Sequence, residues 1–197
     1  MGRRALPKGH CSARTQRIKR GEVERVKKKS SALVGILMGS DSDLEVMRET
    51  EKRLDGFGIS YETRILSAHR SPHATLEYAE SASERGIEVI IVGAGAAAHL
   101  AGAVAANTTV PVIGVPIDSS ALKGIDALLS TVQMPAGVPV ATMAIGKAGA
   151  ANAAIFAAQI LARKEPQISA RLVRLKKEMA SGVAEKDRKL RTERQSR

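Results

Sequence analysis

Residues 66–72 have the sequence LSAHRSP, and they mark the place where a predicted strand passes into a predicted helix. The strand, residues 59–66, alternates apolar and polar positions, and Pro72 favours a first helical turn with Ser71 as its cap. His69 and Arg70 therefore lie at the carboxyl end of a strand, where open α/β sheets hold their ligands. A solvated loop with a capping serine would have the same local pattern, so only the rest of the chain distinguishes a ligand-binding loop from a solvated one.

Apolar runs on both sides of this loop predict five strands that alternate with helices. The predicted strands are residues 33–38, 59–66, 87–92, 110–116 and 138–144. The predicted helices run to about residue 54, over 72–84, to about residue 107, over 121–132 and over 148–163. This alternation is typical of parallel strands with right-handed crossovers. We therefore expect an α/β fold, a three-layer αβα sandwich of the flavodoxin-like or Rossmann-like kind. Its five-stranded parallel sheet would have the order 2-1-3-4-5, and a C-terminal helix would follow.

The net charge of +11 is distributed unevenly, and this distribution suggests the domain boundaries. Residues 1–31 carry a net charge of +9, residues 32–163 carry −4 and residues 164–197 carry +6. Residues 1–31 also lack a hydrophobic period, which predicts a disordered basic extension. We expect a catalytic domain over residues 32–163 and a basic helical tail over 164–197. Because basic ends are often only solvated, we do not expect nucleic acid as a partner.

Several classes of protein are disfavoured by composition. No apolar run approaches the length of a membrane span, so no membrane partner is expected. The single cysteine, Cys11, excludes an internal disulfide framework and fits a reducing cytosol, so a cytoplasmic location is predicted. His69 and His73 are four residues apart, but Pro72 lies between them and zinc usually needs three protein ligands. We predict no metal.

Two polar loops at the same edge of the predicted sheet suit a phosphorylated ligand. After the first strand, Ser40 and Ser42 stand at a helix start, where hydroxyl and backbone N–H groups bind phosphate. Asp43 suits a sugar diol, although all three residues could simply cap the helix. After the second strand, the donors of Arg70 match a phosphate, and His69 can exchange a proton near neutral pH.

The third loop, residues 93–99, is built of small residues, so its backbone can come close to a ligand. It ends at His99, which could contact a ligand or serve as a hydrogen-bonded structural histidine. The sequence leaves both readings open. Because parallel strands place these three loops at one edge, we predict that they form one site.

Five motifs occur in an order that resembles a known family. They are residues 39–47 (GSDSDLEVM), 67–70 (SAHR), 94–100 (AGAAAHL), 133–140 (QMPAGVPV) and 145–152 (IGKAGAAN). The chain resembles the 5-(carboxyamino)imidazole ribonucleotide mutases, the class I PurE family of phosphoribosylaminoimidazole carboxylase catalytic subunits, over about residues 32–163. Ala96 stands where the family often has a second glycine, and Ala101 where it often has proline.

The resemblance implies a mutase of purine biosynthesis that moves a carboxylate from the exocyclic nitrogen of an aminoimidazole ribonucleotide to ring carbon 4. It implies His69 as the catalytic acid and base, with no metal and no cofactor. The substrate-binding residues that it implies are Ser40, Ser42, Asp43, Ser67, Arg70, Ala94, Gly95 and Leu100. One alternative is the related carboxylase that uses free carbon dioxide. A second is a nucleotide-binding flavodoxin-like module without catalysis.

Two C-terminal segments predict an oligomer. Residues 148–163 form an alanine-rich stretch without a charge before Arg163, which indicates a helix covered on more than one face. Beyond Pro166 an apolar stripe follows at Ile168, Leu172, Leu175 and Met179. A neighbouring subunit is the expected partner of this stripe, and packing against its own domain is the alternative. The family resemblance implies a homo-octamer.

Overall fold

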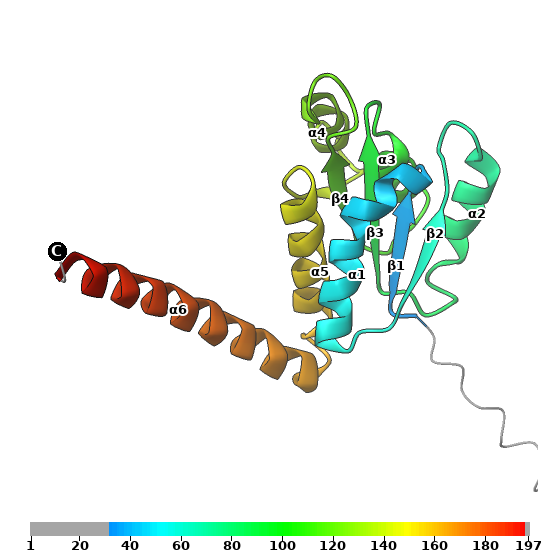
Figure 1. The fold of residues 1–197 in the computed structure, drawn as a ribbon. Helices are drawn as coiled ribbons and strands as arrows, with labels where there is room; N and C mark the ends of the chain where they lie inside the picture. Colours follow the sequence, from blue (N-terminus) through cyan, green and yellow to red (C-terminus); the bar gives the residue numbers. More distant parts are fainter. Residues whose placement is uncertain (1–31, 196–197) are drawn as a thin grey trace, which may run out of the picture.

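The computed structural model describes residues 32–195, so the predicted basic extension at residues 1–31 lies outside the described part of the chain. Figure 1 shows the elements. In chain order they are β1 (Val34–Met38), the 3-10 helix η1 (Asp41–Asp43), α1 (Leu44–Phe57), β2 (Tyr61–Ile65), α2 (Pro72–Ser81), β3 (Val89–Gly95), α3 (Leu100–Ala105), β4 (Val112–Ile117), α4 (Ile125–Val132), β5 (Ala141–Thr142), α5 (Lys147–Leu161) and α6 (Pro166–Gln195).

The five strands form one sheet in the order β2-β1-β3-β4-β5. Every neighbouring pair is parallel, and β1 pairs Val34 with Tyr61 of β2 on one side and with Val89 of β3 on the other. The predicted class, strand order and parallel arrangement are confirmed. The chain order reverses between β1 and β3, so the loops after these strands flank a crevice at the carboxyl edge.

Helices cover both faces of the sheet, because the central strands are apolar on both faces. On one face, alternate strand residues such as Ile36 and Ile91 pack against α1, α5 and the start of α6. On the other, Leu37, Ile90 and Val92 pack against α2, α3 and α4. The period of two along each strand thus divides the interior into two cores and produces the three predicted layers.

All five strands lie where the sequence predicts them, with shifted ends, and β3 and β5 differ most from their predicted bounds. β3 continues through Gly95, because Ala94 and Gly95 still pair with Pro116 and Ile117 of β4. The predicted small-residue loop is therefore shorter and starts at Ala96. β5 has only two residues, because residues 138–144 pair with β4 only at Ala141 and Thr142.

The alanine-rich α5 is a central helix of this chain. Ala150, Ala153, Ala154 and Ala157 are fully buried, and the hydroxyl of Thr50 in α1 donates to the carbonyl of Ala150 at 2.9 Å. Small side chains allow this close approach of α1 and α5. Other parts of the same chain therefore cover most of the surface of α5.

Helix α6 leaves the body of the molecule after its first turns and projects away from the sheet, as Figure 1 shows. Ile168 is buried, and Leu172 and Leu175 pack against the same core, so the beginning of the predicted stripe is covered by its own domain. Further along, Met179 is 47% and Val183 68% exposed. Within residues 32–195, no helix has the length and apolar character needed to span a membrane.

Candidate functional site

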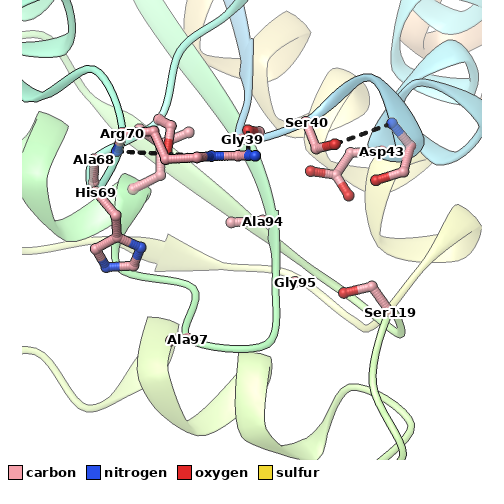
Figure 2. Close-up of a pocket in the computed structure, with 13 residues that line it drawn as sticks. Gly39, Ser40, Asp43, Ala68, His69, Arg70, Ala94, Gly95, Ala97 and Ser119 are labelled. Carbon is pink, nitrogen blue, oxygen red and sulfur yellow. Dashed lines mark hydrogen bonds between the residues drawn. The ribbon is translucent and has the colours of Figure 1, made fainter.

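A cavity of about 300 Å³ lies at the carboxyl edge of the sheet. Four connections that follow β1, β2, β3 and β4 line it, as Figure 2 shows. Its lining contains all nine predicted site residues, namely Ser40, Ser42, Asp43, Ser67, His69, Arg70, Ala94, Gly95 and Leu100. Gly39, Ala68, Ala97 and Ser119 complete it. The loops predicted to converge do meet in one pocket.

The connection after β1 presents a short helical turn to the cavity. Ser40 caps this turn: its hydroxyl oxygen accepts from the backbone N–H of Ser42 at 3.4 Å, and its O–H donates to the carboxylate of Asp41 at 3.0 Å. The helix start therefore has its amide groups and hydroxyls at the pocket wall. Such a terminus attracts a phosphate through its N–H groups and its positive dipole end.

Asp43 is the buried acid of this turn, with only 5% of its surface exposed. Burial raises the pKa of its carboxyl above the ordinary value, and backbone hydrogen bonds from Ser40 and Gly39 and the charge of Arg70 oppose that rise. A desolvated carboxylate at a pocket wall is a strong hydrogen-bond acceptor. It can therefore hold the hydroxyl groups of a sugar.

The connection after β2 holds Arg70 across the cavity. Its Nη2 donates to the carbonyl of Gly39 at 2.7 Å, and its backbone N–H donates to the hydroxyl of Ser67 at 3.2 Å. Figure 2 shows the guanidinium reaching from the His69 side of the pocket toward Gly39. The arginine is thus tethered where it meets the turn after β1, and both together can bind one anion.

Ser71 is the N-cap residue of α2, as predicted, but its side chain forms no capping hydrogen bond. Its hydroxyl oxygen accepts from the N–H of Ser67 at 2.9 Å, and its O–H lies 3.2 Å from the Ser67 carbonyl, where it donates. The side chain turns back to close the loop because these partners lie within it. Ser71 therefore holds the shape of the segment that carries His69 and Arg70.

His69 forms a pair with His99, a contact that the sequence left open. Nε2 of His69 lies 2.9 Å from Nδ1 of His99, and the two rings meet edge to face with their centroids 5.0 Å apart. One proton lies between the two nitrogens, so the pair sets the tautomer and orientation of the His69 ring. His99 precedes α3 without capping it through its side chain.

Gly95 and Ser119 form the floor of the cavity. A Cβ atom at position 95 would overlap the Ser119 hydroxyl, so only glycine allows β3 and the connection after β4 to meet here. Ala96 follows in a left-handed conformation with φ of 50°, which glycine adopts more readily than alanine. Sequence reasoning missed Ser119, although it follows the fourth strand at the same edge as the other loops.

Within residues 32–195 no cluster of three or more His, Cys, Asp and Glu side chains is arranged to hold a metal ion. The site is instead built from one paired imidazole, one guanidinium, one carboxylate and several hydroxyl and backbone groups. These groups can bind a phosphate and a sugar and can transfer a proton.

The sequence and the fold both match known proteins. The model of the AIR carboxylase family matches residues 33–182. The chain is 56% identical over 163 residues to the N5-carboxyaminoimidazole ribonucleotide mutase of Pyrococcus horikoshii, covering 83% of this chain and 91% of the relative. It is 61% identical over 137 residues to the protein of the same name from Pseudomonas aeruginosa, covering 70% and 84%.

Among solved structures, the fold resembles Treponema denticola PurE, with a TM-score of 0.73 and 29% sequence identity. The match covers 80% of this chain and 97% of that one. The family match spans the sheet and every loop that lines the cavity. The chain belongs to the AIR carboxylase family.

Proposed function

We propose that this chain is an N5-carboxyaminoimidazole ribonucleotide mutase of purine biosynthesis. It interconverts 5-(carboxyamino)imidazole ribonucleotide and 4-carboxy-5-aminoimidazole ribonucleotide. Relatives that are 53–61% identical carry the mutase name. The observation that carries the proposal is the gathering of His69, Arg70 and Asp43 in one cavity, where proton transfer, phosphate binding and sugar binding are combined.

The parts of the nucleotide are assigned to different walls of the cavity. The phosphate lies at the turn after β1, where Arg70, Ser40 and Ser42 supply positive charge and donors. Asp43 accepts hydrogen bonds from the ribose. The imidazole ring lies against Ala94 and Gly95, whose small size lets the β3 backbone approach, and against Leu100 of α3. Ser67 supports Arg70 through a hydrogen bond.

His69 serves in turn as acid and base. As an imidazolium it gives a proton to the exocyclic nitrogen while the nitrogen–carbon bond of the carbamate breaks, and carbon dioxide is released within the pocket. Ring carbon 4 is enamine-like beside the amino group, and it forms a bond to the carbon of carbon dioxide. Neutral His69 then removes the proton from carbon 4, so the ring regains aromaticity and the histidine regains its charge. Closure around the nucleotide keeps the carbon dioxide in place between the two steps.

His99 acts as a positioning residue in this scheme. Its contact with Nε2 leaves Nδ1 of His69 as the ring nitrogen without a protein partner among the described residues. A fixed ring presents that nitrogen in one direction, which lowers the entropy cost of each proton transfer.

A choice of substrates tests the function. We expect the purified chain to convert the carbamate substrate without added bicarbonate. Aminoimidazole ribonucleotide with bicarbonate should react far more slowly. The reverse preference would make the chain a carboxylase of free carbon dioxide. No turnover with either substrate, in a folded protein that binds the nucleotide, would identify a non-catalytic nucleotide-binding module.

We also propose that the chain assembles as a homo-octamer and acts in the cytoplasm. Helix α4 supports assembly, because one of its faces is apolar and exposed: Ile125, Leu129 and Val132 are 49–52% exposed, and Leu122 in the turn before the helix is 63% exposed. An apolar face of this kind typically marks a protein–protein interface. Nucleic acid is not a proposed partner, and a gel shift at physiological salt tests this, since phosphate-driven binding weakens steeply with salt.

A further inference from the structure

Ser119 is the one residue of the connection after β4 that lines the cavity. Figure 2 shows its hydroxyl directed into the pocket, on the same side as Asp43 and across from His69. The reacting ring belongs near His69 in the proposed function. The Ser119 hydroxyl therefore contacts a part of the nucleotide that lies away from the reacting atoms.

The position of the Ser119 side chain is set by its neighbour Gly95. A Cβ atom at position 95 would overlap the hydroxyl oxygen and would come within 2.8 Å of the Ser119 Cβ atom. The serine thus packs on the bare Cα of Gly95, which is fixed by its pairing with Ile117 in the sheet. A hydroxyl group on such a rigid base is preorganised for a ligand.

Among the described residues, no protein group forms a hydrogen bond with the Ser119 hydroxyl. The hydroxyls of Ser67 and Ser120 differ, because they accept from the backbone N–H groups of Arg70 and Leu122 at 3.2 and 3.1 Å. Ser119 is therefore a donor that faces the cavity and is available to the ligand.

We propose that Ser119 is a substrate-binding residue that donates a hydrogen bond to the ribose hydroxyl held by Asp43, from the same side of the cavity. The inference rests on the proposed function and assigns the sugar subsite within it. A carboxylate such as Asp43 can only accept, so the ribose hydroxyl that it holds uses its proton there and keeps its lone pairs free. Ser119 supplies a donor for those lone pairs, so the two side chains together satisfy one ribose hydroxyl.

Steady-state kinetics of three variants test this. Ser119→Ala should raise KM for the natural nucleotide about threefold to tenfold, the range of a neutral hydrogen bond, and should leave kcat within about twofold. Ser119→Thr keeps the hydroxyl and should restore KM. Ser120→Ala is the matched control, because its hydroxyl serves the loop backbone; it should leave KM unchanged.

Nucleotides that lack the 2′- or the 3′-hydroxyl identify the group that Ser119 contacts. Removing the contacted ribose hydroxyl should reduce affinity less in Ser119→Ala than in the wild type, because the variant already lacks the serine hydroxyl that binds it. An unchanged KM in Ser119→Ala, a loss confined to kcat, a threonine variant that fails to restore KM, or no change in either deoxy penalty would overturn the inference. A wild-type protein without mutase activity would instead overturn the proposed function.

Discussion

His69 is paired through Nε2 with His99 and lines the candidate active site, so its replacement separates chemistry from binding. His69→Asn should retain the fold and nucleotide affinity but lose turnover by roughly a hundredfold to ten-thousandfold, the usual contribution of a general acid and base. His73→Asn is the control, because His73 lies in α2 and does not line the cavity. Near-normal kcat in folded His69→Asn would contradict the assignment.

Arg70 should bind the phosphate more than the rest of the nucleotide. Arg70→Ala should weaken nucleotide binding by about 1.5–3 kcal/mol, the range for hydrogen bonds to charged groups. The dephosphorylated nucleoside should be affected much less, since it lacks the group that the guanidinium contacts. Calorimetric titration with both ligands makes the comparison, and equal losses would show that Arg70 only supports the loop through Gly39.

The burial of Asp43 predicts that its ionised carboxylate lowers the stability of the fold while it strengthens nucleotide binding. Because burial raises its pKa above 3.8, the folded state binds this proton more tightly than the unfolded chain does. Ionised Asp43 therefore costs stability, and this cost grows as the pH rises from 3.8 through the folded-state pKa. Asp43→Asn should increase the free energy of unfolding at pH 7, and the increase should shrink as the pH falls toward 3.8.

The same variant should lose affinity for the nucleotide, because a charged acceptor contributes about 1.5–3 kcal/mol to a hydrogen bond. Urea unfolding at several pH values, together with nucleotide titration, measures both effects. A variant that is less stable than wild type at pH 7 would show that the backbone hydrogen bonds from Ser40 and Gly39 outweigh the desolvation of the carboxylate.

At the scale of elements, the start of α5 depends on a glycine. A Cβ atom at Gly149 would overlap the backbone carbonyl oxygen of Ala144, and a backbone group cannot move aside as a side chain can. Gly149→Ala should therefore lower the free energy of unfolding by about 1–3 kcal/mol or more. Gly56→Ala in α1 is the control: no atom lies within 4 Å of the added Cβ, so this variant should gain about 0.5–1 kcal/mol. Equal effects of both variants in urea unfolding would exclude a clash at Gly149.

Sheet ends were harder to predict than sheet centres. The apolar runs of β1, β3 and β4 are buried on both faces, which is why a continuous apolar run in the sequence is enough to predict where these strands lie. β5 forms an edge of the sheet, where a single neighbour decides how many residues pair. The extension of β3 through Gly95 likewise depends on its partner β4 and not on its own residues.

At the scale of the whole molecule, the exposed apolar face of α4 predicts subunit contacts. Leu129 is 51% exposed, so Leu129→Lys should leave the isolated fold intact. A buried lysine without a partner is costly, so the variant should shift the protein from an octamer to smaller species at micromolar concentration. Light scattering measures the mass. Glu80→Lys on α2 should leave the assembly unchanged, and a wild-type protein that is already a monomer would contradict the proposed assembly.

The local pattern of the sequence was enough to determine the sandwich, the strand order and the convergence of Ser40, His69 and Ala94 at one edge. Periods of 2 and 3.6 residues are properties of neighbouring positions, and the direction of parallel strands then places their loops together. The family motifs lie on these loops, so all nine predicted residues line the cavity that the structure contains.

Only the tertiary structure decided which side chains meet inside that cavity. His69 contacts a histidine thirty positions away, Gly95 packs under Ser119, and the Ser71 side chain closes its own loop without a capping hydrogen bond to α2. The first contact joins the connections after β2 and β3, and the second joins β3 to the connection after β4. Their geometry therefore depends on the registers of β2 against β1, β1 against β3 and β3 against β4. The sequence pattern does not specify the distances between these side chains, because contacts between loops depend on backbone conformations that the packed sheet and helices impose.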